Sequence, residues 1–464
     1  MTAARTAPAP PTVPERPATF RDVFAVAEFR VLFVSFGVFL IGETVKMLAL
    51  SVLVYERTGS GLIAALAYVT GFLPHAFGGV FLLALADRWP PRALMVGYDL
   101  LRLALVVVLA VGVLPPTGML ALVFVVGLFG PVSSAARTAL LPEMLHGDAY
   151  VLGRSLLTVA SGGTQVVGFA VGGLLLGLVG PYGALWLTAA TCALSALLVR
   201  LGLRHRPGRR SAQPDGPSDE AAGPSGAVVG QSDGVVGPSG EAAGQPVARA
   251  GRSGGRRRAT SGAVRETWRV NRELLGDRRI RGLLLAQWLP GSMLVGAEAV
   301  AVPYAAELGP GTSAGVLLMA GAFGMLVGDL LVGRFVAPAL RERLSPWLAL
   351  LLGVPLLVFP LRPGLAVAAV LFAVAAAGYA YQLGLARRFL DAVPPGRRGQ
   401  AFGLTGTGMM TAQGLAAAGA GALSELTGPA VAMAASGAAS LLTTLLLWHV
   451  LTARPVPDGR TVAA

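Results

Sequence analysis

The stretch LADRWPPRALMVGYDLLR, Leu85 to Arg102, decides the fold class because it places charge between two apolar runs. One apolar segment ends where the stretch begins, and another starts within it. Between them lie Asp87, Arg88 and Arg92 around the pair Pro90–Pro91. We interpret this charged interval as a loop where the chain leaves a membrane on one helix and re-enters it on the next.

The composition supports this interpretation. Hydrophobic residues make up 54% of the 464 residues and charged residues only 13%, and the mean hydropathy is +0.67. An ordinary soluble domain carries about 25% charged residues. A water-soluble fold could not cover so much apolar surface, so the composition predicts a polytopic membrane protein.

Segments long enough to cross a bilayer recur along the chain. A spanning helix needs about 20 apolar residues, and we predict twelve such segments. They are residues 31–54, 62–85, 93–113, 118–138, 156–179, 183–200, 281–305, 313–335, 346–361, 364–386, 401–423 and 429–451.

The arginines fall mainly on one alternating set of loops. The net charge of +13, from 37 Lys+Arg against 24 Asp+Glu, suggests nucleic-acid binding at first. However, the opposite set of loops holds little beyond Arg57 and Arg362. This asymmetry follows the positive-inside rule. It predicts a multi-pass protein of the plasma membrane with both termini in the cytoplasm, and no nucleic-acid partner.

Two parts of the chain break the apolar pattern. The N-terminus is Pro- and Ala-rich without the apolar core of a signal peptide. Residues 204–262 are rich in Gly, Pro and Ser, which favours a flexible linker. Residues 264–276 then read either as a short amphipathic helix on the inner leaflet or as a charged stub before the seventh span.

The predicted organisation has five parts. They are a disordered cytoplasmic tail (1–22), an N-terminal six-helix bundle (23–203), a cytoplasmic linker with its short helix (204–278), a C-terminal six-helix bundle (279–453) and a cytoplasmic tail (454–464).

The two bundles carry signs of an internal repeat. Gln165, Gly173 and Gly180–Pro181 recur 248 positions later as Gln413, Gly421 and Gly428–Pro429. Homologous six-helix halves related by an axis along the membrane normal are a known transporter design. Chance similarity between apolar helices is the alternative.

The charged loop resembles a family signature. LALADRWPPR, Leu83 to Arg92, is similar to the loop 2–3 motif of the major facilitator superfamily, Gly-x-Leu-Ala-Asp-Arg-x-Gly-Arg-Arg/Lys. It departs from the motif at Leu83, where the family has Gly, and at Pro90–Pro91, where it has Gly-Arg. The resemblance implies an all-α membrane protein with the major facilitator fold, twelve transmembrane helices forming two pseudo-symmetric six-helix bundles.

Other segments narrow the resemblance to one branch. MVGYDLLR, LVYERTGSG at 53–61, RTALLPEML at 137–145 and PPGRRGQAFGL at 394–404 resemble the macrolide-efflux and siderophore-exporter branch. This branch implies drug efflux by antiport and antibiotic resistance.

Five residues form a predicted conformational latch at the inner face: Asp87, Arg88, Arg92, Asp99 and Arg102. An Asp at a helix–loop junction can accept from free N–H groups at a neighbouring helix start. Arg88 and Arg92 can pair with acids on other helices, and Asp99 and Arg102 form an i,i+3 pair one turn inside the third span. A role limited to enforcing topology is the alternative.

Span one holds Glu43 and Lys46, and Lys46 is the only lysine of the chain. An ionisable group at the bilayer centre costs at least ~2.5–3.5 kcal/mol on insertion scales. At spacing i,i+3 the two can pair on one helix face. We predict that Glu43 takes up and releases a proton beside Lys46, with Glu298 in span seven as a second deep acid. A self-neutralised pair that only packs is the alternative.

The remaining candidates concern the substrate and helix packing. Spans one, four, seven and ten line the cavity in this superfamily. An apolar wall with polar groups is predicted from Trp288, Met293, Tyr379, Tyr381 and Gln382. In span five, Gly168, Gly172 and Gly173 form a small-residue face that permits close helix packing.

The sequence lacks the motifs of ATP-driven transporters and of metal-dependent enzymes. The sequence has no Walker loop, no HExxH and no Cys/His cluster, so we predict no metal, no cofactor and no enzyme activity.

The prediction is a monomeric secondary transporter in the lipid bilayer. It exports a drug-like or secondary-metabolite small molecule by alternating access, coupled to protons. The alternatives are a major facilitator importer of another solute and a membrane-embedded enzyme or scaffold acting on lipid-linked substrates.

Overall fold

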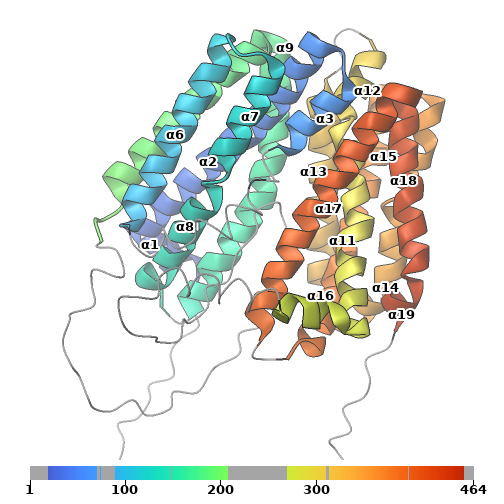
Figure 1. Ribbon diagram of the computed structural model, residues 1–464. Coiled ribbons are helices and arrows are strands. Elements are labelled where there is room, and N and C mark those ends of the chain that lie inside the picture. The colour runs from blue at the N-terminus through green and yellow to red at the C-terminus, as the bar shows by residue number, and fades with distance from the viewer. Residues whose placement is uncertain are drawn as a thin grey trace, which may run out of the picture.

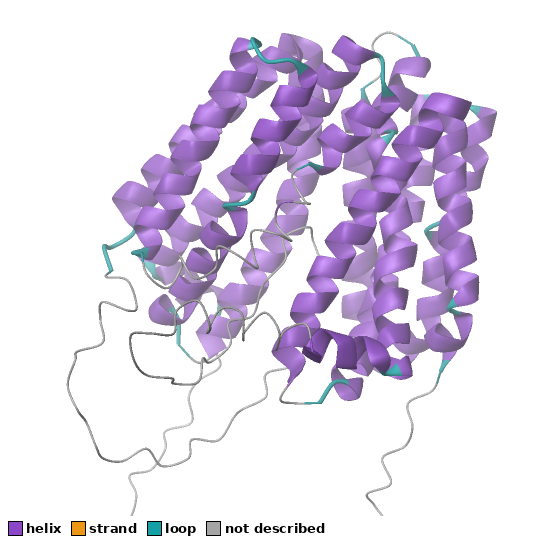
Figure 2. Cartoon of the chain, in the orientation of Figure 1, coloured by secondary structure: helices purple, strands orange, loops and turns teal. Residues whose placement is uncertain are grey.

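The computed structural model describes residues 19–70, 74, 89–146, 148–206, 269–309, 313–394 and 397–453. In these ranges all regular structure is helical, and no strand occurs (Figure 2). The first group of helices is α1 (Phe20–Ala25), α2 (Ala27–Thr58), α3 (Gly61–Val69), α6 (Pro91–Val111), α7 (Pro116–Gly127), α8 (Gly130–Met144) and α9 (Asp148–Gly202).

The second group follows after residue 268. It comprises α11 (Arg278–Ala299), α12 (Ala301–Glu307), α13 (Ala314–Phe335), α14 (Pro338–Leu351), η1 (Pro355–Leu361), α15 (Leu365–Ala377), η2 (Gly378–Ala380), α16 (Tyr381–Ala392), α17 (Arg398–Thr427), α18 (Pro429–Leu446) and α19 (Trp448–Thr452). The two groups stand side by side as separate halves (Figure 1).

Proline and glycine set many of the helix ends. Four helices begin on a proline, which lacks the N–H that the first turn leaves unbonded: α6, α7, α14 and α18. Gly59 and Gly112 end α2 and α6 in the left-handed conformation, with φ of 64° and 77°. Gly180, with φ 69° and ψ 178°, breaks α9 into two helices just before Pro181.

Eight helices of the described ranges are long and apolar enough to cross a membrane, or nine if α11 and α12, bent by 41°, form one span. The long helix α9 contains the fifth and sixth predicted segments on either side of Gly180. The helix α3 is the described part of the second segment, and α17 covers the eleventh. The count is therefore consistent with twelve helices.

Some predicted features lie outside the described residues. These are the latch residues Asp87 and Arg88, residues 1–18 of the N-terminal tail, residues 207–268 of the linker and the tail from residue 454. Residues 269–276 of the proposed amphipathic segment are helical.

Two glycines bring α9 of the first half against α13 of the second. A Cβ atom on Gly173 would lie 3.0 Å from the Cα of Gly315 and 2.9 Å from Ser313 Oγ. A Cβ atom on Gly315 would overlap the backbone of Gly173. The backbones of the two halves therefore touch directly at this point.

A second contact joins α3 to α17. A Cβ atom on Gly421 would lie 2.8 Å from the Cβ of Ala65. The carboxylate of Glu425 accepts hydrogen bonds from Ser60 Oγ and, at 3.4 Å, from the Leu62 N–H. We call the end of the molecule that carries the α3–α17 and Gly173–Gly315 contacts the closed end; it is the upper end in Figure 1.

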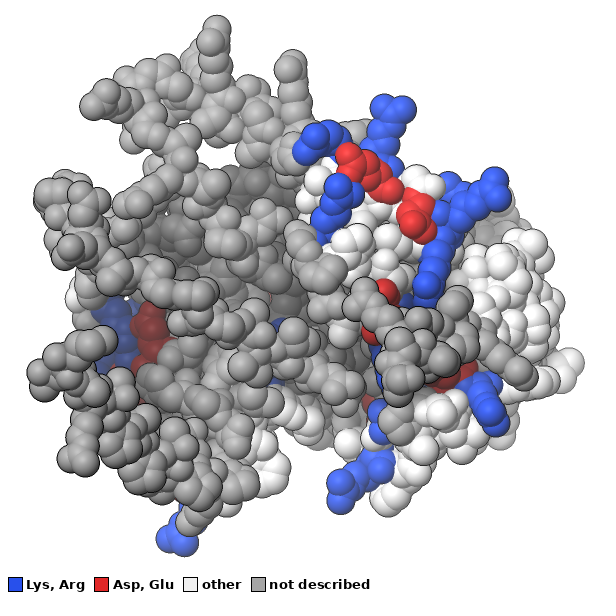
Figure 3. Space-filling model, turned by 90° about the horizontal axis from the view of Figure 1, so that it is seen from below, with Lys and Arg blue, Asp and Glu red and all other residues white. Residues whose placement is uncertain are grey.

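Toward the opposite end the helices of the two halves diverge (Figure 1). Both α1 and α19, the first and last described helices, lie at that lower end. Basic side chains, with acidic ones among them, lie on its described surface (Figure 3). In the second half, Arg387 pairs with Asp391 and Arg397 with Glu273. The lower end is thus the charged one.

Replacing Gly315 tests whether the closed end depends on small residues. We expect Gly315→Leu to cost about 1–3 kcal/mol in the described conformation, because its side chain has no space beside Gly173. The closed end should therefore open. Spin labels at Glu56→Cys and Leu426→Cys in a Cys192→Ser background should move further apart. Gly177→Leu on α9, where a Cβ meets nothing within 4 Å, is the matched control. If the distance between the labels does not change in Gly315→Leu, the closed end does not depend on the small residue at this position.

Candidate functional site

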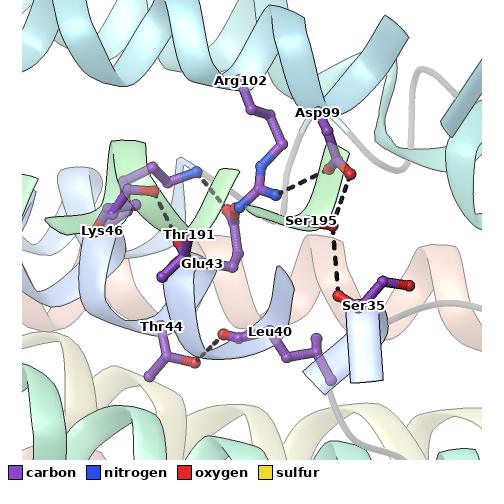
Figure 4. A network of polar contacts seen from close by, with 10 residues as sticks. Ser35, Leu40, Glu43, Thr44, Lys46, Asp99, Arg102, Thr191 and Ser195 are labelled. Carbon is purple, nitrogen blue, oxygen red and sulfur yellow. Dashed lines mark hydrogen bonds and ion pairs between the residues drawn. The ribbon is translucent and has the colours of Figure 1, made fainter. Parts of the chain in front are cut away.

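A network of charged side chains lies inside the N-terminal half (Figure 4). Its members are Glu43 and Lys46 on α2, Asp99 and Arg102 on α6, and Ser195 on α9. Arg102 is 1% exposed, Asp99 2% and Lys46 5%. Burial this deep requires each charge to have a partner, since an unpaired ion in a protein interior costs several kcal/mol.

Arg102 connects the two carboxylates. Its Nη2 donates to Glu43 Oε2 at 2.7 Å, and its Nη1 lies 3.5 Å from Asp99 Oδ1. Lys46 Nζ donates to the other oxygen of Glu43. Ser195 Oγ donates to Asp99 Oδ2 at 2.7 Å. The network therefore ties together three helices of one half.

The sequence predicted the Glu43–Lys46 and Asp99–Arg102 pairs separately, each at spacing i,i+3. The structure brings them into one network, so Asp99 and Arg102 on α6 lie with the proposed coupling residues. Arg92 donates from Nη1 to the Leu203 carbonyl at 3.1 Å, also within the N-terminal half. In the part of the chain that the structure describes, none of these three latch residues contacts the other half.

Close packing of α2 on α9 positions the network. A Cβ atom on Gly168 would lie 2.7 Å from Thr44 Cβ, and one on Gly172 would lie 3.3 Å from a methyl group of Leu48. On α2, a Cβ atom at Gly42 would overlap the hydroxyl of Thr191. Gly42 therefore lets α2 pack closely on the segment of α9 after Gly180, which also carries Ser195.

Arg137 on α8 is a neighbour that the sequence reasoning missed. Its guanidinium lies 4.6 Å from the ring centroid of Phe36 and 4.9 Å from that of Phe39. The guanidinium of Arg102 lies 4.1 Å from the same Phe39 ring. The available signal was an arginine inside the predicted span 118–138, because charges within spans are rare.

Glu298 has a different environment. Its Oε2 accepts a hydrogen bond of 3.2 Å from the hydroxyl of Tyr68, which is buried on α3. This bond joins α11 of the second half to α3 of the first. The structure thus places Glu298 at the contact between the halves, with Tyr68 as its hydrogen-bond donor, and not in the Glu43 network.

The predicted cavity residues are largely buried among helices of the second half. Tyr379, Tyr381 and Gln382 are at most 9% exposed, and Trp288 and Met293 are partly buried. Trp288 Nε1 donates to the Thr405 carbonyl at 2.9 Å, and Gln413 Nε2 donates to the Tyr379 hydroxyl at 3.4 Å. These bonds hold α11, η2 and α17 together.

Tyr381 compensates for a proline. Pro290 in α11 has no N–H to donate to the Ala286 carbonyl four residues earlier. The Tyr381 hydroxyl donates to that carbonyl at 3.0 Å and approaches the Gln287 carbonyl at 3.1 Å. Its fully buried side chain therefore has a structural task.

Comparisons with known proteins fit this architecture. The family model described as Major Facilitator Superfamily matches residues 32–384. A search of the curated proteins found no match.

Solved structures share the fold over most of the chain. A POT family transporter in complex with a thioalcohol-conjugated peptide has a TM-score of 0.63 and 11% identity, covering 90% of this chain and 95% of that one. A D-xylose–proton symporter gives 0.60 and 15%, covering 93% and 98%. A bacterial homolog of the human lysosomal transporter Spinster, inward-facing and unoccupied, gives 0.61 and 15%, covering 94% and 96%. Together with the family model, they confirm the predicted fold class, an all-α membrane protein of the major facilitator type.

Replacing Arg102 should show how strongly the stability of the protein depends on the network. We expect Arg102→Met to destabilise the protein by about 3–5 kcal/mol, because Asp99 loses its ion pair and Glu43 loses one of its two cationic partners. Thermal unfolding of the purified protein measures the loss. Adding Asp99→Asn to Arg102→Met should recover part of it, since the buried carboxylate is then neutral. Arg30→Met, at an exposed position on α2, is the control. Additive losses in the double variant contradict direct coupling.

The hydrogen bond from Tyr381 to the carbonyl freed by Pro290 can be tested with a double-mutant cycle. Tyr381→Phe should cost about 1–3 kcal/mol, because it leaves the buried Ala286 carbonyl without its donor. In a Pro290→Ala background the same change should cost less, since the substituted alanine regains an N–H for that carbonyl. Unfolding temperatures of the four proteins give the answer. An equal cost in both backgrounds contradicts the assigned task of the hydroxyl.

Proposed function

Because the chain belongs to the major facilitator superfamily and is therefore a membrane transporter, we propose that it couples the export of a small amphipathic molecule to proton entry through the network around Glu43. Uphill transport without ATP needs an ion gradient, and a proton-driven cycle needs a group that takes up and releases a proton inside the membrane. Glu43 is the candidate that the geometry supports best.

One observation carries this choice. The side chain of Glu43 is 31% exposed, whereas those of its partners Lys46 and Arg102 are 7% and 1% exposed. The carboxylate is thus the open edge of an otherwise buried network. A proton arriving there would neutralise the one anion that pairs with both cations, and Lys46 and Arg102 would then lose their shared partner.

The contacts between the halves supply the conformational part of the proposal. The described state is joined at the closed end through Gly173, Gly315 and Gly421. Alternating access requires this end to separate while the other end closes. With the arginine-rich end in the cytoplasm, the described state is the inward-open one, as the Spinster homolog is described to be. Asp87 and Arg88 remain proposed as a latch for the opposite state.

Export is the proposed direction because of the branch resemblance at 53–61, 137–145 and 394–404. One of the similar structures is a D-xylose–proton symporter, so the fold itself leaves uptake as the second candidate. A pump-deficient host expressing the protein should survive higher doses of its substrates, and a proton uncoupler should remove the advantage. Sensitisation by the same compounds would instead favour uptake. Glu298, at the Tyr68 contact, is the second candidate for coupling.

The coupling role of Glu43 can be isolated with Glu43→Gln. The amide cannot change charge, so uphill transport in vesicles with an imposed proton gradient should fall at least about 100-fold, the scale expected when an essential proton-transfer group is lost. Binding and downhill exchange should persist. Glu307→Gln, an exposed carboxylate on α12, should leave both activities unchanged. Full uphill transport by Glu43→Gln transfers the coupling role to Glu298.

A further inference from the structure

A buried arginine that forms no ion pair in the described residues, although Asp99 attracts it from a greater distance, lies beside the Glu43 network. Arg137 is 8% exposed, and its Nε has no hydrogen-bond partner. Across the described ranges, no ion pair involves its guanidinium. Arginines that only fix topology can stay in water, as Arg30 does on α2.

The network offers Arg137 only the shared charge of Asp99, with no direct ion pair in the described residues. Glu43 already receives hydrogen bonds from Lys46 and Arg102. Asp99 receives one from Ser195 and pairs with Arg102. Two carboxylates thus face three cations, and the cluster has a formal surplus of one positive charge.

The aromatic rings offset only part of this surplus. Arg137 lies over Phe36 and Phe39, and a cation–π contact contributes about 0.5–2 kcal/mol. The cost of a buried unpaired ion is several kcal/mol. In addition, Arg102 leaves its Nε and Nη1 without hydrogen-bond acceptors, although Nη1 has the 3.5 Å ion pair. Both arginines that lie near the Phe39 ring therefore have guanidinium nitrogens without a hydrogen-bond acceptor.

We propose that Arg137 and Arg102 form a subsite for the carboxylate of an organic anion whose apolar body packs on Phe36 and Phe39. A guanidinium matches a carboxylate in charge and in its paired donors. The exposed edge of Glu43 is the side from which such a ligand reaches the network. This subsite rests on the proposed role of the Glu43 network and goes beyond it by naming the chemical class of the substrate. An anionic substrate favours the uptake candidate over export.

Equilibrium binding tests the subsite without a gradient. The full-length protein in nanodiscs is heated with 2-naphthoate or with 2-naphthamide, which has nearly the same shape but no charge. We expect naphthoate to raise the unfolding temperature by about 2 °C or more and naphthamide to raise it less, since a ligand that binds only the folded state stabilises it.

The variants assign the effect to Arg137. Arg137→Gln should abolish the difference between the two probes without lowering the unfolding temperature of the ligand-free protein. Arg137→Lys should keep a reduced difference, because the charge remains but the paired donors are lost. Arg30→Gln should keep the full difference.

Three results would overturn the subsite. They are equal shifts with the two probes in the parent protein, a full carboxylate-specific shift in Arg137→Gln, and an Arg137→Gln protein that fails to fold or unfolds well below the parent, which would show that the guanidinium is already paired. The two proposals can fail separately. If transport proves not to be coupled to protons but the protein still binds naphthoate more strongly than naphthamide, the proposed function is wrong and the subsite is supported.

Discussion

The need to neutralise Arg102 organises the N-terminal half. Its guanidinium is buried between Glu43 on α2 and Asp99 on α6, and Asp99 is held by Ser195 on α9. A buried ion pair adds little net stability over an apolar core but is costly to break. These contacts therefore fix how three helices sit against one another. A change in the charge of Glu43 therefore affects the contacts among all three helices.

The contact between the halves is built differently. At Gly173–Gly315 and Ala65–Gly421 the helices meet through small side chains and bare backbone, and these contacts carry no charge. Dispersion contacts of this kind are individually weak and leave no unpaired ion when they separate. Glu425 and Glu298 add hydrogen bonds across the halves, to Ser60 with Leu62 and to Tyr68. The charged network thus holds one half together, whereas the contact between the halves is mainly apolar.

The sequence predicted the parts of this arrangement that depend on local spacing. Span length and composition gave the helical membrane fold, and spacing i,i+3 gave the Glu43–Lys46 and Asp99–Arg102 pairs. It did not predict that the pairs join, because that contact depends on how α2 and α6 are rotated about their axes. For the same reason the sequence did not reveal Arg137, nor that the Tyr381 hydroxyl donates to a carbonyl freed by Pro290.

The charge of the ligand decides how such a network couples to protons. Lys46, Arg102 and Arg137 oppose Glu43 and Asp99, so the formal charge is +1 with Glu43 ionised and +2 with Glu43 protonated. An anion binds more tightly to the protonated form, and by linkage its binding favours uptake of the proton. Proton and anion then move together. A cation binds more tightly to the ionised form and exchanges with the proton. A carboxylate at Arg137 therefore supports the uptake candidate, whereas proton-driven export requires a neutral or cationic ligand beside Glu43.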